Sequence, residues 1–182
     1  MFLRIKKRKK MNDLATYLPI LQCIVDNMTC DTIFQFGMGD SSTKLFAERY
    51  KNVIAVEMED EMLFETMKEL NFPSHVHLYC ALGQQPGIDI LNSLHQNKFS
   101  CIFVDGHAEN RWQCINESFA KTDVIVTHDT EKIWCNWHLV KKPSHFIWMD
   151  IKQFNPWTSV LTCNHDVIRF LVKQFPSYTI RN

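Results

Sequence analysis

The sequence predicts an α/β fold in which a mostly parallel β-sheet lies between two layers of helices. Short apolar runs rich in β-branched and aromatic residues alternate with segments of helical spacing, as crossover connections require. The run at residues 53–56 is continuously apolar, which is typical of a strand covered on both faces. Polar residues follow the ends of these runs, where open parallel sheets bind ligands.

Composition is that of an ordinary globular chain. Of the 182 residues, 46% are hydrophobic and 22% are charged. Twenty Lys and Arg balance twenty Asp and Glu, but six of the basic residues lie within residues 4–10. We expect a single domain over residues 12–182, preceded by a basic, disordered head at 1–11. The alternative is that this head is a nuclear localisation signal or a segment that binds nucleic acid or a membrane surface.

Cysteines and apolar runs indicate the compartment. The seven cysteines are widely spread and form no Cys-x-x-Cys pair, which favours a reducing environment. No apolar run reaches transmembrane length. Residues 14–25 contain Thr, Tyr, Pro and Gln, so we expect an amphipathic helix there rather than a signal peptide. The protein is therefore expected to be cytoplasmic, without a membrane span.

The elements can be assigned in chain order. A helix is expected from residue 12 or 13 to about 28, bent or restarted at Pro19. A strand at 31–36 ends at Gly37, and one of the hydroxyl residues Ser41, Ser42 and Thr43 caps a helix that runs to about 50. Further strands are expected at 53–57, 75–80, 99–105, 123–127, 145–151 and 157–162, and further helices at 59–70, 88–94, 111–119 and 166–173. The last two strands must be antiparallel neighbours, because the turn between them is too short for a parallel crossover.

A glycine-rich turn after the first strand indicates a ligand site. Gly37 and Gly39 let the backbone turn sharply and approach a ligand closely. Glu57, twenty residues after the first glycine, can accept hydrogen bonds from two ribose hydroxyls. The third glycine of the dinucleotide fingerprint is missing, because Ser42 stands there, and this weakens an NAD or FAD site.

Three motifs, in order, resemble those of class I S-adenosylmethionine-dependent methyltransferases. They are Phe-Gly-Met-Gly-Asp-Ser-Ser-Thr at 36–43 with Glu57, Val-Asp-Gly-His at 104–107 with Arg111, and Thr-His-Asp-Thr at 127–130. The first two are similar to a subset that methylates oxygen on small molecules and sugars. The resemblance covers roughly residues 32–171. It implies a Rossmann-like three-layer sandwich whose mostly parallel seven-stranded sheet has a C-terminal antiparallel hairpin.

The resemblance also implies a cofactor, S-adenosylmethionine, and the residues that bind it. The glycine loop would lie under the methionine part, Glu57 would bind the ribose, and Met58 and Ala81 would lie against adenine. The implied set is Gln35, Gly37, Gly39, Ser41, Ser42, Thr43, Glu57, Met58, Ala81 and Asp105. At Gln35 the family usually has an acid that contacts the cofactor's amino group, and an amide gives up that charge-assisted bond.

The candidate catalytic residues are His107, Asp105 and His128. Transfer to a hydroxyl needs a base, and His107 is the first candidate and His128 the second, with a surface histidine as the alternative for His107. Asp105, His128 and Asp129 also occupy the places where metal-dependent O-methyltransferases hold Mg²⁺, although Asp129 would equally suit a helix cap. Arg111 would hold an anionic acceptor or form a surface salt bridge.

These observations predict an S-adenosylmethionine-dependent methyltransferase that acts on oxygen of a small molecule or sugar. A binding protein that keeps the fold but has little or no catalysis is the alternative that Gln35 favours. An enzyme directed at nucleic acid through residues 1–10 is a further alternative.

Overall fold

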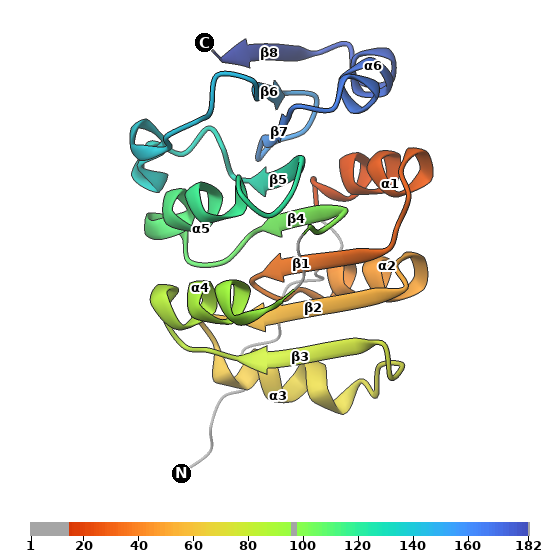
Figure 1. The fold of residues 1–182 in the computed structure, drawn as a ribbon, viewed down its shortest axis with the longest axis vertical. Helices are drawn as coiled ribbons and strands as arrows, with labels where there is room; N and C mark the ends of the chain where they lie inside the picture. The colour runs from red at the N-terminus through yellow and green to blue at the C-terminus, as the bar shows by residue number, and fades with distance from the viewer. Residues whose placement is uncertain (1–14, 96–97, 182) are drawn as a thin grey trace, which may run out of the picture.

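The computed structural model describes residues 15–95 and 98–181, so the predicted basic head lies outside the described residues. Its strands are β1 (Thr32–Phe36), β2 (Asn52–Glu57), β3 (Val76–Cys80), β4 (Cys101–Val104), β5 (Val124–His128), β6 (Ile147–Ile151), β7 (Thr158–Thr162) and β8 (Tyr178–Arg181). They form one sheet in the order β3-β2-β1-β4-β5-β7-β6-β8, which runs from bottom to top of Figure 1.

Most of the sheet is parallel, as the sequence predicted. β1 pairs in parallel with β2 and β4, and the same holds for β2 with β3 and β4 with β5. β7 is antiparallel to both β5 and β6, which confirms the C-terminal hairpin. β8 adds an eighth strand, antiparallel to β6, to the seven that were predicted.

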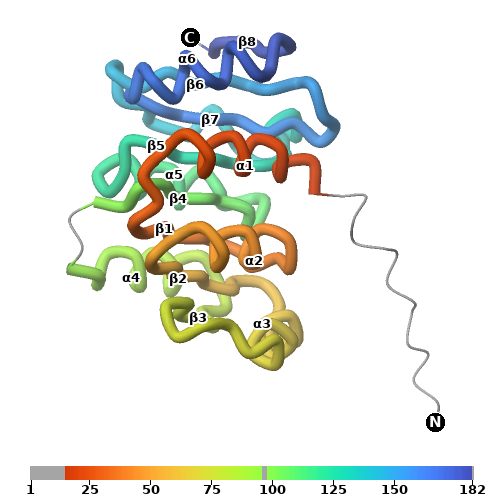
Figure 2. Tube along the Cα trace, turned by 90° about the vertical axis from the view of Figure 1, so that its right-hand side faces the viewer, coloured from red at the N-terminus to blue at the C-terminus, as the bar shows by residue number. Residues whose placement is uncertain are grey.

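Helices cover both faces of the sheet and complete a three-layer sandwich. They are α1 (Leu18–Asn27), α2 (Asp40–Arg49), α3 (Glu61–Glu69), α4 (Gln84–Ser93), α5 (Arg111–Ser118) and α6 (His165–Gln174). One apolar cluster joins α1, α2 and α6 to the sheet, and a second joins α4 and α5 to its other face. Figure 2 shows α6, α1, α2 and α3 following one another along the sheet.

Two helix starts can be compared with the sequence. α1 begins at Leu18, with Pro19 in its first turn, which agrees with the restart predicted at Pro19, whereas residues 12 and 13 lie outside the described part. α4 begins four residues before the predicted residue 88, so Pro86 and Gly87 belong to the helix rather than to a loop. Proline is tolerated near a helix start, because the first N–H groups have no partner within the helix.

The predicted cap of α2 is wrong. Gly39 occupies the N-cap position, and no side chain caps the helix. Ser42 and Thr43 lie inside the helix, and their hydroxyls bond the side chain of Gln35 in β1. Gln35 is fully buried, so its amide needs hydrogen-bond partners within the fold, and these hydroxyls provide them.

Short elements escaped the sequence analysis. They are β8 and the 3₁₀ helices Ala108–Asn110, Ile133–Cys135 and Trp137–Leu139. Segments of three or four residues are too short to show a periodicity. Arg181 attaches β8, because its Nε lies 2.6 Å from Asp150 Oδ2 and its Nη2 donates to the carbonyl of Thr130 at 2.8 Å.

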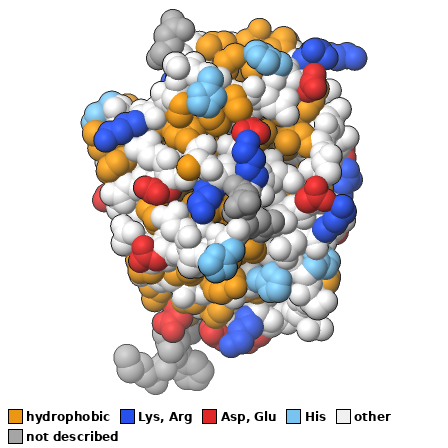
Figure 3. All heavy atoms as spheres, viewed as in Figure 1, with side chains coloured by type: hydrophobic (Ala, Val, Ile, Leu, Met, Phe, Trp, Pro, Cys, Tyr) orange, Lys and Arg blue, Asp and Glu red, His pale blue; other side chains and the backbone are white. Residues whose placement is uncertain are grey.

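None of the helices in the described ranges is both long and apolar enough to cross a membrane. On the face drawn in Figure 3, acidic and basic side chains are interspersed over the surface. A large basic patch is not visible on that face.

Candidate functional site

The carboxyl ends of β1, β2, β4 and β5 meet at one edge of the sheet. Phe36 at the end of β1 pairs with Val56 of β2 and with Val104 of β4. Val104 pairs in turn with Thr127 of β5. This register brings the loop after β1, the end of β2, the loop after β4 and the end of β5 side by side, and the predicted site residues lie on them.

Gly37 allows the loops after β1 and β4 to touch. Its φ is +78°, and a Cβ at this position would lie 2.6 Å from the carbonyl oxygen of Asp105. The backbone N–H of Asp105 donates to the carbonyl of Phe36 at 2.9 Å. Both the backbone conformation and the close contact therefore require glycine.

The buried side chain of Gln35 supports the glycine loop through hydrogen bonds. Its Nε2 donates to the carbonyl of Gly37 and to Ser42 Oγ, both at 2.8 Å. Its Oε1 accepts from Thr43 Oγ1 at 3.1 Å. Both N–H groups are used, so in this arrangement the amide supports the loop rather than facing a ligand. The sequence analysis did not anticipate this role.

Glu57 connects two loops through its carboxylate. Oε1 accepts backbone N–H bonds from Met58 and Glu59 at 2.8 Å and from Asp60 at 3.3 Å. Oε2 accepts from the N–H of Met38, in the loop after β1, at 3.3 Å. The residue is only 2% exposed. Three donors share Oε1, whereas Oε2 accepts a single N–H bond, so Oε2 is the oxygen that can accept from a ligand hydroxyl.

Met58 and Ala81 lie in an apolar layer beside α4. They are 2% and 7% exposed and belong to the cluster that contains Ile88. A Cβ on Gly87 would lie 2.6 Å from Met58 Sδ, and one on Gly106 would lie 2.0 Å from Met58 Cε. The thioether thus occupies the space that these two glycines leave free.

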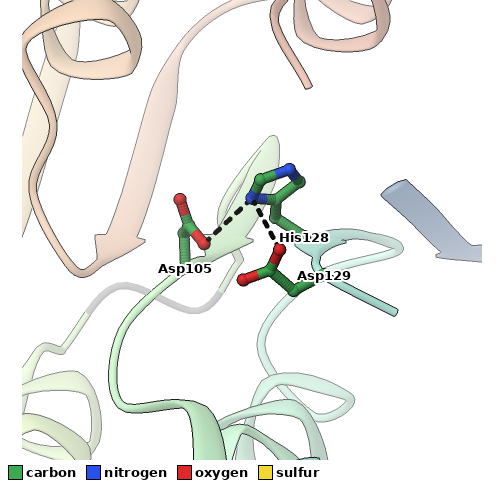
Figure 4. Close-up of side chains that lie close together, drawn as sticks. All are labelled: Asp105, His128 and Asp129. Atoms are coloured by element: carbon green, nitrogen blue, oxygen red, sulfur yellow. Dashed lines mark ion pairs between the residues drawn. The ribbon is translucent and has the colours of Figure 1, made fainter. Parts of the chain in front are cut away.

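Asp105, His128 and Asp129 converge from the ends of β4 and β5 (Figure 4). Their ligand atoms all lie within 4.8 Å of one another. His128 Nδ1 is 3.4 Å from Asp105 Oδ1 and 3.8 Å from Asp129 Oδ1. Two carboxylates and one imidazole nitrogen therefore face a common point. Such a group can take up a proton or hold a metal ion.

Arg111 is buried beside this cluster and is 5% exposed. Its Nη2 lies 3.0 Å from Asp105 Oδ1, and its Nη1 lies 3.4 Å from Asp129 Oδ2. Nε donates to the carbonyl of Gly106 at 2.9 Å, and Nη1 donates to that of His128 at 2.7 Å. Arg111 is therefore neither a surface salt bridge nor a free anion-binding group. It balances the charge of the two acids.

Asp129 has a second cationic partner, Lys132, whose Nζ lies 2.7 Å from Oδ1. Burial acts to raise the pKa of the Asp129 carboxyl, but the Lys132 hydrogen bond and the charge of Arg111 act in the opposite direction, and the pKa is lowered. The helix-cap role considered for Asp129 is wrong, because the next helix is Ile133–Cys135, which has Lys132 at its N-cap and no side-chain cap.

Thr16 and Tyr17, just before α1, contact the imidazole ring of His128. Thr16 Oγ1 lies 2.9 Å from His128 Nε2. The ring of Tyr17 meets the imidazole edge-on, with centroids 4.9 Å apart. Burial, and then the charge of Asp105, raise the pKa of Tyr17 to about 12, so its phenol stays neutral. Neither residue could be found from the sequence, because hydropathy periodicity does not report contacts between distant positions, such as the 112 that separate Thr16 from His128.

His107 is not part of the converging group of three residues. It stands at the N-cap of the 3₁₀ helix Ala108–Asn110. Its Nδ1 is buried and has no hydrogen-bond partner within residues 15–95 and 98–181.

No protein-family model matches the sequence, and no curated protein matches it. Solved structures do match. An O-methyltransferase from Bacillus cereus in complex with SAH has a TM-score of 0.61 at 13% identity, with 81% of this chain and 79% of that chain covered. The O-methyltransferase TomG from Streptomyces achromogenes, involved in tomaymycin synthesis and solved in complex with SAM, has a TM-score of 0.59 at 13% identity. The match covers 82% of this chain and 79% of that chain. An rRNA methylase from Streptococcus thermophilus has a TM-score of 0.50 at 12% identity, with 78% of this chain and 92% of that chain covered. At such identities the similarity shows the fold alone.

Proposed function

We propose that this chain, whose fold is that of the class I S-adenosylmethionine-dependent methyltransferases, binds that cofactor and transfers its methyl group to an oxygen of a small acceptor. The observation that carries the proposal is the convergence of Asp105, His128 and Asp129 at the sheet edge that also bears the glycine loop. A base and a cofactor loop at the same edge of the sheet are what methyl transfer to a hydroxyl requires.

The chemistry of the glycine loop fits the methionine part of the cofactor. A Cβ on Gly39 would lie 3.4 Å from the Tyr17 hydroxyl, so glycine leaves free space between them. The Asp105 side chain is 22% exposed and offers a carboxylate to the amino group. We assign Gln35, Ser42 and Thr43 the support of this loop, and we leave Ser41, partly exposed in the first turn of α2, as a candidate contact.

The adenosine part would lie over Glu57, Met58 and Ala81. We propose that Glu57 Oε2 exchanges its 3.3 Å bond from the Met38 N–H for the ribose hydroxyls. Oε1 would keep its shorter bonds and hold the loop after β2. The buried thioether of Met58 would then serve as the apolar floor under adenine.

His128 is the base in this proposal. The bound cofactor supplies an electrophilic methyl group on a positively charged sulfur. His128 Nδ1 takes the proton of the acceptor hydroxyl, and the neighbouring carboxylates of Asp105 and Asp129 stabilise the imidazolium that forms. Arg111 keeps both carboxylates in position. His107 remains the second candidate.

A Mg²⁺ ion is a less favoured part of the proposal. Asp105, His128 and Asp129 would hold it, and it would lower the pKa of an acceptor hydroxyl. However, Arg111 and Lys132 already balance the two carboxylate charges, at 3.0 and 2.7 Å. Magnesium also prefers oxygen ligands to an imidazole. We therefore expect methyl transfer to persist in EDTA, and a strict requirement for added Mg²⁺ would favour the metal.

Exposed apolar side chains in the 3₁₀ segment after Asp129 indicate which kind of acceptor the site would bind. Ile133 and Trp134 are 86% and 57% exposed. Lys132, which contacts Asp129, lies with its Nζ 5.9 Å from the centre of the Trp134 ring. An exposed indole and an aliphatic side chain this close to the acids favour an acceptor with a flat, apolar body. For a nucleic-acid acceptor, the basic residues that would bind phosphates lie outside the described residues.

A binding protein without catalysis is the second candidate. It is favoured by the internal hydrogen bonds of Gln35 and Glu57, whose side chains already support their own loops. In that case the loops would be stable without any cofactor, and S-adenosylmethionine would not compete for those groups.

Calorimetric titration with S-adenosylmethionine and S-adenosylhomocysteine decides between the two. We expect saturable binding of both by the wild type and none by Gly37→Ala, because a Cβ there drives the loops after β1 and β4 apart. Gly83→Ala is the matched control, since Gly83 also has positive φ, +104°, but its Cβ would meet nothing closer than 3.8 Å. Absence of binding by a folded wild type would leave the binding protein as the better candidate.

A further inference from the structure

The hydroxyl of Thr16 lies between two groups from distant parts of the chain. Its Oγ1 is 2.9 Å from His128 Nε2 and 2.9 Å from the carbonyl oxygen of Pro156. A threonine hydroxyl has one proton to donate and two lone pairs that accept. The two contacts therefore cannot both be donated by Thr16.

The carbonyl of Pro156 fixes the direction of both bonds. A carbonyl oxygen only accepts, so the hydroxyl proton of Thr16 points toward it. Otherwise two oxygens would face each other at 2.9 Å with no proton between them. The oxygen of Thr16 then accepts from His128, and this network assigns the ring hydrogen to Nε2.

This assignment decides what His128 presents to the two acids. When Nε2 carries the hydrogen, Nδ1 of the neutral ring keeps its lone pair. Nδ1 faces the carboxylates of Asp105 and Asp129, at 3.4 and 3.8 Å, so three acceptors meet without a proton among them. Arg111 and Lys132 neutralise the carboxylates through contacts with the carboxylate oxygens. A ligand hydroxyl that donates to Nδ1 would supply a proton to this group of acceptors.

We infer that Thr16 is a positioning residue that holds His128 as the Nε2–H tautomer and so makes Nδ1 the atom that receives the acceptor's proton. The inference rests on the proposed function for the reaction itself. In that reaction the acceptor oxygen bonds the methyl carbon, the carbon–sulfur bond breaks with its electron pair left on sulfur, and the hydroxyl proton passes to Nδ1. The resulting imidazolium keeps its Nε2–H bond to Thr16 and is stabilised by the two carboxylates already beside Nδ1.

Tyr17 holds the same ring by a contact that cannot select a tautomer. The rings lie 4.9 Å apart at 80°, and Tyr17 packs on Phe103 with centroids 5.1 Å apart. An edge-on aromatic contact fixes the plane of the imidazole but does not distinguish its two nitrogens. The choice of tautomer therefore falls to Thr16.

The ¹⁵N shifts and long-range couplings of the imidazole report its tautomer directly, and a His128→Gln spectrum identifies the signals. At a pH where the ring is neutral, we expect a protonated Nε2 and a bare Nδ1 in the wild type. Thr16→Val, which has the same shape without the hydroxyl, should shift much of the population to Nδ1–H, and Thr16→Ser should not. A wild-type ring protonated at Nδ1, at both nitrogens throughout the pH range of the fold, or unaltered in Thr16→Val would overturn the inference.

Kinetics provide the second readout. We expect Thr16→Val to lower kcat by about 10- to 100-fold, the usual effect of removing a group that orients a functional histidine, with cofactor affinity unchanged. Thr16→Ser should restore the rate. Thr66→Val is the control, because the Thr66 hydroxyl donates only to the carbonyl of Met62 within α3. Equal rates for Thr16→Val and the wild type would contradict the role of Thr16.

The two proposals fail in distinguishable ways. If the wild type binds no cofactor but shows the Nε2–H tautomer that Thr16→Val loses, the proposed function is wrong and the assignment of the tautomer stands. If methyl transfer is observed and His128 carries its hydrogen at Nδ1, the function stands and the role of Thr16 is wrong.

Discussion

Arg111 Nη2 lies 3.0 Å from Asp105 Oδ1, with both groups largely shielded from water. The same guanidinium contacts Asp129 and two backbone carbonyls, so it joins the loop after β4 to the end of β5. Removing one partner of such a buried pair leaves charges without compensation, which costs more than the pair contributes when intact. The site therefore depends on Arg111 for its shape as well as for its charge.

Arg111→Met should lower the free energy of unfolding by about 3–5 kcal/mol, measured by urea denaturation. Arg169→Met is the control, because the Arg169–Asp166 pair spans 3.1 Å but both side chains are more than three-quarters exposed. Loss of this exposed ion pair should lower the free energy of unfolding by less than about 1 kcal/mol. An Arg111→Met protein as stable as the control variant would show that Asp105 and Asp129 tolerate each other without the guanidinium.

His128→Gln should lower kcat by about 10²- to 10⁴-fold, as expected for loss of a base, with cofactor affinity kept. His107→Gln should change kcat less than about tenfold. Both rates would be measured with the same acceptor at saturating cofactor. The opposite order would return the role of base to His107, the first candidate in the sequence.

Glu57→Ala should destabilise the protein even without cofactor, by about 2–3 kcal/mol, because four backbone N–H groups lose a charged acceptor. Thermal denaturation of the apo protein measures this. Glu61→Ala is the control, since Glu61 is exposed in the first turn of α3 and should contribute about 0.3–1 kcal/mol. Equal melting temperatures for the two variants would mean that Glu57 is held for a ligand rather than for the fold.

Tyr17→Phe should remove a pH dependence at alkaline pH. Burial, followed by the charge of Asp105, raises the pKa of Tyr17 from 10.0 to about 12. Above pH 10 the unfolded phenol ionises and the folded one does not, so stability present below pH 10 is lost as the pH rises toward 12. The loss is on the order of 2 kcal/mol. Urea unfolding of both proteins between about pH 9 and pH 12 tests this, and parallel curves would contradict it.

The architecture could be predicted because it depends on local patterns. The continuous apolar run of β2 indicated a covered strand, and the short turn at Asn155-Pro156 required antiparallel neighbours. The motifs at Gly37, Asp105 and His128 follow strand ends, and a parallel register is enough to bring them to one edge. Their proximity therefore follows from topology.

The partners of the site residues could not be predicted, because they depend on three-dimensional contacts between segments far apart in sequence. Arg111 lies next to the Val-Asp-Gly-His motif in the chain, yet its burial follows from carbonyls and acids on two strands. Ser42 and Thr43 have good capping side chains, but the buried amide of Gln35 competes for their hydroxyls. Thr16 belongs to none of the sequence motifs, so its contact with His128 could not be predicted.

The attachment of β8 has a consequence for the order of synthesis. Arg181 bonds the carbonyl of Thr130, directly after the Asp129 of the site, and Thr16 bonds His128 from the opposite end of the described chain. The neighbourhood of His128 is thus assembled from residues made first and residues made 165 positions later (16 to 181). A ribosome must translate almost all of this sequence before these contacts are complete, so a product that stops before Arg181 lacks the bond to Thr130 even if β1 to β5 have already folded.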